Sequence, residues 1–495
     1  MKTLGAAISI CLVCCAQLAL AQTPGQGGAA PATPPPAIPA PSGPREGTPR
    51  NNSPGFRLPG LSIQLNLGAL LNRGVPQGEE PSEPGQVLVM WPDETSAGEG
   101  ERLMQQRGLL AAQRLTLVEL NVVLALYQLP DDRAALALRD ELRVLQPGWV
   151  VDLNARARPH QSPARAATSN AAPARLFAQQ MLGLAAAALP PSTIKVGVVD
   201  TTIDPVLLGT PADVAGPTWN GSRITVRSML ASGDTPASSP HGSAVALLMA
   251  GAPLPNGFAG AAPALHFHWA TALRKVGETD STNSWLLAQA FDWLLAQKVQ
   301  LINLSLGGTG DEILRAVTAR VLSHGVALVA AAGNRADTAP VYPGAYPGVW
   351  AVTAVDAAGQ PYRSATRGAH VSFAAPGVDV WVPEVMGLVA LRGVSAMSGN
   401  AASAAAFIPG RYVSGTSYAT ALASAALARL PASFWQLAPE ARKSRLCSTA
   451  RAPQNNDVPM GCGVLHFETS SLVAASASAS ASASASSTPS LIKSP

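Results

Sequence analysis

Continuous apolar runs mark the centre of the chain. Four short runs between residues 192 and 360 are apolar at nearly every position and alternate with helix-forming stretches. They are 194–199, 299–304, 325–331 and 349–355. Strands without polar alternation are buried on both faces, which is typical of a parallel sheet covered by helices. Because ligands bind at the carboxyl ends of such strands, chemistry is expected there.

An earlier stretch, residues 85–158, predicts a smaller unit. Its apolar and helical patterns predict strands at 86–91, 115–119, 122–129 and 149–153, and helices at 96–107 and 133–145. The second helix carries an apolar stripe at spacings of three and four residues, formed by Ala135, Leu138, Leu142 and Leu145. The order βαββαβ is that of a small α+β, ferredoxin-like unit. Its function does not follow from that order alone.

Glycine and proline are abundant, with 44 and 43 residues, and they divide the chain. Residues 22–84 are rich in both, and residues 471–495 are rich in Ala and Ser. Neither segment has apolar periodicity, so both are predicted to be disordered tethers. Residues 159–192 carry arginines among Ala, Pro and Ser without an acidic residue. This stretch is predicted to be an exposed linker that contains a processing site.

Residues 1–21 have the pattern of a signal peptide. Lys2 supplies a basic start, residues 4–20 are mostly apolar, and Ala19 and Ala21 form a small-x-small cleavage signal. An apolar first helix of the fold and a lipid anchor at a cysteine of this segment are the alternatives. No later apolar run is long enough to span a membrane, so no retained span is predicted. We expect a secreted protein, extracellular or periplasmic.

Cysteine usage agrees with export. Removal of the signal peptide leaves Cys447 and Cys462, which are 15 residues apart. In an exported protein such a pair predicts one disulfide, and two buried thiols are the alternative. A metal site is not predicted here, because two cysteines without a histidine at ligand spacing fall short of four ligands.

The charge content narrows the class of partner. Charged residues make up 13% of the chain and the net charge is +4. That composition excludes a coiled coil and a highly charged disordered protein. No basic run with interleaved aromatic residues is present in the sequence, so nucleic acid is not expected as a partner.

Three reactive side chains stand at predicted element ends. Asp200 follows the first buried strand, and His241 opens a helix. Ser417 precedes an apolar helix whose unpaired N–H groups and positive dipole end suit a developing oxyanion. Asn334 follows another strand and offers a side-chain amide. Taken singly, each of these residues can equally be a helix cap or a turn residue.

Together these residues resemble the subtilase family of subtilisin-type serine proteases. Asp200, His241 and Ser417 occur in the family's chain order, and Asn334 follows Gly333 as in the family. Further segments similar to family signatures are 260–263, 302–308, 342–347 and 375–377. The resemblance covers about 193 to 470 and implies a three-layer α/β domain with a parallel sheet. An α/β-hydrolase esterase would need G-x-S-x-G and the order Ser, acid, His, and the chain has neither.

The resemblance implies a serine endopeptidase that acts on polypeptides. His241 would take the proton of Ser417, and Asp200 would orient the imidazole ring. Asn334 and the Ser417 N–H would hold the oxyanion. The residues whose backbone would pair with an extended substrate are Ser305, Leu306 and Gly307.

The small unit at 85–158 resembles a subtilase propeptide by its element order and its place before the main domain. In that family the propeptide is an intramolecular chaperone and inhibitor, so the chain's own propeptide is an expected partner and self-maturation is expected. The tail near residues 153–158 would lie nearest the active site. The family often binds structural calcium, but no acidic cluster in the sequence identifies a site, and no cofactor is expected.

Some positions depart from the family pattern. Thr202 and Leu247 replace usual glycines, Ala421 replaces a usual proline, and Pro240 replaces a common glycine. These residues put the shape of the cleft in doubt. A catalytically silent subtilase-fold binding or structural protein is therefore the alternative function.

Overall fold

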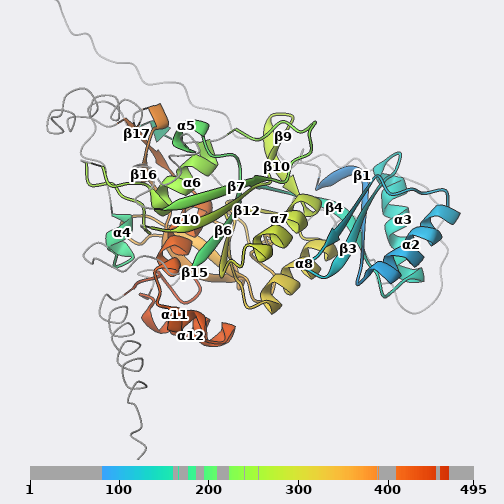
Figure 1. Cartoon of the computed structure of the whole chain (residues 1–495). Helices are drawn as coiled ribbons and strands as arrows, with labels where there is room; N and C mark the ends of the chain where they lie inside the picture. The colour runs from blue at the N-terminus through green and yellow to red at the C-terminus, as the bar shows by residue number, and fades with distance from the viewer. Residues whose placement is uncertain are drawn as a thin grey trace, which may run out of the picture. The chain divides into compact units, whose positions relative to one another are not determined.

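The architecture comes from a computed structural model of the chain (Figure 1). The structure describes residues 81–159, 165–166, 177–184, 194–208, 222–238, 240–254, 256–262, 264–386, 388, 409–452 and 458–467. The predicted signal peptide (1–21), the Ala/Ser-rich tail (471–495) and nearly all of the predicted tether (22–84) lie outside the described residues. All described residues belong to one compact unit. We call residues 82–159 the N-terminal region and residues 194–467 the main region.

Seven parallel strands form the central sheet of the main region, in the order β15-β14-β13-β11-β6-β8-β7. Their bounds are β6 (Lys195–Asp200), β7 (Arg223–Ser228), β8 (His266–Thr271), β11 (Leu301–Leu304), β13 (Ala327–Ala331), β14 (Trp350–Val355) and β15 (Val371–Pro376). Every neighbouring pair is parallel. Because the strands are parallel, Asp200 at the end of β6 and the residues after β13 lie at one edge of the sheet.

Helices cover both faces of this sheet, which gives three layers (Figure 1). One face packs on α6 (Pro240–Ala250) and α10 (Thr416–Ala428), and the other packs on α7 (Ser284–Ala296) and α8 (Glu312–Ser323). Successive strand residues alternate between the two cores, as Val198 and Val199 do. The predicted α/β fold with a parallel sheet is confirmed.

Three strands of this sheet were not predicted. β7 is an edge strand whose side chains are mostly exposed, so it lacks a continuous apolar run. β8 carries His266 and His268, and β15 carries Ser372, which interrupt their apolar patterns. All three strands are positioned by pairing with their neighbours rather than by an apolar run of their own.

The N-terminal region has the order βαββαβ. Its elements are β1 (Ser82–Trp91), α2 (Glu94–Gln106), β2 (Gln113–Leu117), β3 (Val122–Gln128), α3 (Asp132–Leu145) and β4 (Val150–Pro159). The strands pair antiparallel in the order β2-β3-β1-β4. One face of this sheet packs on α2 and α3, and the other packs on α7 and α8 of the main region (Figure 1).

Strand β4 extends further than its sequence predicts. The expected strand ended at 153, whereas β4 continues to Pro159. Its second half pairs antiparallel with β10 (Thr279–Asn283) and β12 (Leu306–Gly308) of the main region. The alternating Ala and Arg residues of this half carry no strong strand signal, so the partner strands determine its conformation.

Part of the predicted linker packs on the main region. Residues 177–184 contain α4 (Ala178–Met181), and Leu182 and Leu184 are buried in the core that holds α6 and α10. Phe467 N donates to Leu182 O at 2.9 Å. β5 (Arg165–Ala166) pairs with β17 (Gly410–Val413), which also pairs with β16 (Val380–Pro383). The remaining elements are α5 (Pro205–Leu208), β9 (Arg274–Val276), α11 (Ala432–Trp435) and α12 (Pro439–Thr449).

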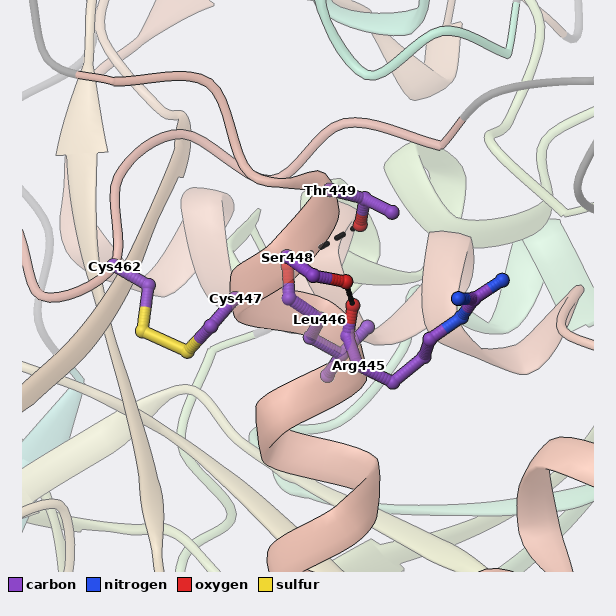
Figure 2. The surroundings of a disulfide bond; sticks show 6 residues. All are labelled: Arg445, Leu446, Cys447, Ser448, Thr449 and Cys462. Atoms are coloured by element: carbon purple, nitrogen blue, oxygen red, sulfur yellow. Dashed lines mark hydrogen bonds between the residues drawn. A yellow bond between two sulfur atoms is a disulfide. The ribbon is translucent and has the colours of Figure 1, made fainter.

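A disulfide joins Cys447, in the last turn of α12, to Cys462 (Figure 2). The two Cα atoms are 5.1 Å apart. The bond ties α12 to the segment whose Cys462 N donates to Ser372 O of β15 at 2.9 Å. No helix in the described part of the chain is both long and apolar enough to cross a membrane.

Candidate active site

Asp200 and His241 form a buried pair at the carboxyl edge of the main sheet. Asp200 is the last residue of β6, and His241 lies in the first turn of α6. His241 Nδ1 lies 2.7 Å from Asp200 Oδ1, and each residue is 1% exposed. A carboxylate only accepts, so Nδ1 is the donor and Nε2 is left to serve as a base.

The end of β6 and the start of α6 are held close together by the residues beside this pair. Gly242 N donates to Thr201 Oγ1 at 2.9 Å, and Trp269 Nε1 donates to Thr201 O at 2.9 Å. A Cβ atom on Gly242 would lie 2.7 Å from Thr201 Oγ1, so only glycine permits this approach. The ring of Tyr418 packs beside the His241 ring, with centroids 5.6 Å apart.

Ser417 is the second residue of α10, which is buried along its whole length. Ser417 Oγ donates to Ser305 O at 2.8 Å, and Ser305 Oγ donates to Ser417 O at 2.9 Å. Ser417 follows Thr416 at the helix N-terminus, where the helix dipole favours negative charge. The structure therefore bonds Ser417 directly to Ser305, and the next residue of α10, Tyr418, packs on His241.

Asn334 is anchored to the residue before Ser417. Its Oδ1 accepts from Thr416 N at 3.1 Å and from Thr416 Oγ1 at 3.0 Å. This orientation leaves Asn334 Nδ2 as the free end of the amide. Gly333 allows the turn after β13, because its φ is 109° and a Cβ there would lie 2.6 Å from Thr366 Oγ1. Thr416 was missed by sequence reasoning, although its place beside Ser417 at a helix start was a usable signal.

Three polar atoms of this cluster are buried without a hydrogen-bond partner among the residues that the structure describes. They are Asp200 Oδ2, His241 Nε2 and Asn334 Nδ2. Polar atoms that the protein itself leaves unpaired are available to bind a substrate. The arrangement offers an acceptor nitrogen and an amide donor near a helix N-terminus that carries a hydroxyl.

The strand next to this cluster is already paired with the chain's own β4. Leu306 is opposite Pro159 and Gly307 is opposite Arg158, while Ser305 lies just before β12. On its other edge β4 pairs with β10, where Thr282 is opposite Ala157. β4 therefore lies between two strands of the main region. β10 was missed because its polar sequence has no strand pattern.

Side chains of the N-terminal region also bind the N-termini of two helices of the main region. Asp152 Oδ2 accepts from Glu312 N of α8 at 2.9 Å. Asn154 Oδ1 accepts from Trp285 N of α7 at 3.1 Å. Each bond satisfies a backbone donor that a helix cannot pair internally. The N-terminal region is thus attached by directed polar bonds as well as by apolar packing.

The departures from the family pattern fit the fold. Thr202 is not among the described non-glycine residues with positive φ, and its Oγ1 donates to Ala237 O at 3.0 Å. Leu247 is 2% exposed within the core. Ala421 is fully buried in α10, and Pro240 begins α6, where a missing N–H has no cost. Within the described ranges, no group of three or more His, Cys, Asp or Glu side chains could hold a metal ion.

Comparison with known proteins identifies relatives of the main region. A model described as the subtilase family matches residues 192–464. A thermostable alkaline protease from Halalkalibacterium halodurans is 34% identical over 178 residues, which are 36% of this chain and 48% of that protein. Subtilisin from Bacillus pumilus is 33% identical over 180 residues, which are 34% of this chain and 63% of that protein. The match thus covers less than two thirds of each relative.

A solved structure extends the likeness of the fold. Fervidolysin from Fervidobacterium pennivorans, described as a keratinolytic enzyme related to subtilisin, matches with a TM-score of 0.59. The match covers 81% of this chain and 62% of fervidolysin, at 18% identity. At that identity the likeness concerns the fold alone.

Proposed function

Since the chain belongs to the subtilase family, we propose that it is a secreted serine endopeptidase that hydrolyses peptide bonds of polypeptides. The observation that carries the proposal is the buried Asp200–His241 bond of 2.7 Å beside the N-terminus of α10. A carboxylate that orients an imidazole, which in turn takes the proton of a serine hydroxyl, activates a nucleophile.

The proposed chemistry assigns one task to each side chain. Rotation about the Cα–Cβ bond of Ser417 turns its hydroxyl from Ser305 O to His241 Nε2, which takes the proton as Oγ attacks the substrate carbonyl. Asn334 Nδ2 and the Ser417 N–H donate to the oxyanion. His241 then protonates the leaving amine, and Asp200 stabilises the cationic ring. In the second half of the reaction, His241 takes a proton from water as the water attacks the acyl-enzyme. His241 then returns the proton to Ser417 Oγ as the ester bond breaks.

The N-terminal region is proposed to inhibit the enzyme until it is removed. β4 is paired on both edges by β10 and β12, which is how an extended substrate is held by main-chain hydrogen bonds. The helix caps from Asp152 and Asn154 add directed bonds at α8 and α7. A chain segment that fills the substrate position excludes other polypeptides, so the precursor is inactive.

The packing of residues 177–184 supports a proposed maturation site nearer to β4. Leu182 and Leu184 are buried in the main region, so residues 177–184 stay with it after cleavage. The cut therefore falls between Pro159 and Phe177. Pro159 is paired with Leu306, the residue after Ser305, whose carbonyl oxygen accepts from Ser417 Oγ. Cleavage is accordingly proposed to follow His160, a residue outside the described part of the chain.

A serine-directed phosphonate probe tests the catalytic proposal. The mature protein is expected to be labelled at Ser417, and His241→Ala is expected to abolish labelling because the hydroxyl loses its base. Ser448→Ala, at an exposed serine of α12, is the matched control and keeps full labelling. A folded mature protein that the probe does not label would instead support a catalytically silent binding protein.

A further inference from the structure

A buried carboxylate of the N-terminal region is bound by the main region beside β4. Glu83, on β1, is 5% exposed. Its Oε1 accepts from Arg274 Nη2 at 2.7 Å and from Asn283 Nδ2 at 2.9 Å, and its Oε2 accepts from Arg156 Nη2 at 2.8 Å. Burial alone would raise the pKa of Glu83, but the hydrogen bonds from Arg156 and Asn283 and the charge of Arg274 outweigh it and lower the pKa.

The two donors of the main region are held in place by contacts of their own. Asn283 Oδ1 caps α7 by accepting from Leu286 N at 3.0 Å, which directs Nδ2 toward the carboxylate. Arg274 is fixed on β9 by the β9–β10 ladder, and its Nη1 lies 3.6 Å from Asp234 Oδ1. A single acid at that distance neutralises Arg274 only in part. The main region therefore offers a positively charged donor and an amide donor at the edge of β10.

We propose that Arg274 and Asn283 form a substrate subsite for an acidic side chain, which Glu83 fills in the precursor. The proposal rests on the proposed function, in which β4 occupies the place of a substrate. In the antiparallel register Arg156 lies directly opposite Asn283. Opposite residues share one face of a sheet, with Cβ atoms about 5 Å apart. An acidic side chain at the position of Arg156 therefore reaches the donors that now bind Glu83.

The precursor itself carries the opposite charge at this position. Arg156 is tolerated there because Glu83 lies between it and Arg274 and supplies the countercharge. After the N-terminal region leaves, a basic side chain at the same position would face Arg274 without Glu83. The subsite thus favours an acidic substrate residue and disfavours a basic one, which also weakens rebinding of a β4 segment without Glu83. In the proposed register this residue is the fifth before the cut bond.

The test uses the mature enzyme and peptides that differ only at the fifth residue before the cut bond, with Glu, Gln or Arg there. We expect kcat/KM to be about tenfold higher for the Glu peptide than for the Gln peptide, and lowest for the Arg peptide. Arg274→Gln is expected to bring the Glu-to-Gln ratio near one. Lys275→Gln is the matched control, because Lys275 pairs with Asp280 at 3.1 Å, and it keeps the ratio. Added salt lowers the ratio.

Two results would overturn the subsite while leaving the peptidase intact. One is equal kcat/KM for the Glu and Gln peptides with the wild-type enzyme. The other is an unchanged ratio in Arg274→Gln. If the folded mature protein cleaves no peptide at all, the proposed function fails, and the subsite that rests on it fails as well.

Discussion

Two buried carboxyl groups, one between the two regions and one in the main region, have pKa values that are shifted in opposite directions. Glu83 faces two arginines, and its pKa is lowered. Asp311 caps α8 and accepts from neutral donors, among them Leu314 N at 2.6 Å and the Ser284 hydroxyl, and the charge of Asp152 also disfavours its ionised form. Burial raises the pKa of Asp311 to about 7. A buried acid stays ionised where cationic donors face it and holds a proton where they do not.

The contact between the two regions and the interior of the main region are therefore stabilised by different interactions. The contact depends on an ionised Glu83 and on helix caps that are lost when the regions part. The core around α10 consists of apolar and hydroxyl side chains and loses nothing at that step. Solution conditions and substitutions are therefore expected to act on release of the N-terminal region and on the main region separately.

The largest expected effect lies inside the main region. Ser417→Ala and His241→Ala should each lower kcat by about 10⁶-fold, the size established for removing either residue of a subtilisin. The double variant should lose no more than either single variant, because the two residues act as a unit. Single-turnover kinetics on a peptide substrate measure this. Additive losses would show that the two side chains do not cooperate.

Asn334→Ala is expected to lower kcat by about 10²–10³-fold, the cost known for losing the equivalent amide donor in a subtilisin. KM should change little, since the amide acts on the oxyanion that forms only in the transition state. Steady-state kinetics of the mature variant measure kcat and KM separately and so test this expectation. A rise in KM with kcat unchanged would place Asn334 in substrate binding instead.

Much of the active site could be predicted from the sequence, because its reactive residues lie beside apolar segments that are recognisable locally. Asp200 follows an apolar strand, and Ser417 begins an apolar helix. The contact of the N-terminal region with the main region could not be predicted. β10 and the second half of β4 have no strand pattern, and they pair with each other across more than 100 positions of the sequence. Glu83 lies next to a proline-rich segment, and no apolar pattern there predicts that its side chain is buried.

Asn154→Ala should weaken the hold of the N-terminal region without altering the chemistry. The substitution removes the acceptor for Trp285 N at the start of α7, and loss of a cap costs about 1 kcal/mol. Activity should therefore appear several-fold faster after precursor cleavage, with kcat of the released enzyme unchanged. Asp140→Asn, at an exposed acid of α3, is the control. An equal rate in both variants would show that the Asn154 cap does not help to hold the N-terminal region.

Acidification should release the N-terminal region. Since the pKa of Glu83 is lowered where the regions are joined, the association is at full strength above the ordinary value of 4.5 and weakens as pH falls through the lowered pKa. Glu83→Gln should weaken the association at neutral pH and flatten this dependence. Cleaved precursor is incubated at each pH and then assayed at neutral pH. Tighter association in acid would contradict the assignment.

The smallest expected effect is a stabilisation by acid, whereas acid weakens the contact at Glu83. Because the pKa of Asp311 is raised to about 7, its protonated form stabilises the main region below its unfolded value of 3.8, and this stability is lost as pH rises through 7. The thermal unfolding midpoint of the uncut Ser417→Ala chain should rise by a few degrees as pH falls from 7 toward 4. Asp311→Asn should flatten that dependence.

The most direct measurement is the intact mass of the secreted precursor and its products over time, beside Ser417→Ala. We predict that the wild-type chain is cut between Pro159 and Phe177, at the bond after His160, and that Ser417→Ala stays whole. The retained fragment then carries residues 177–184, of which Ala178, Leu182 and Leu184 are buried. Cleavage of Ser417→Ala at the same bond and the same rate, in a host without another protease of this kind, would contradict a self-maturing serine endopeptidase.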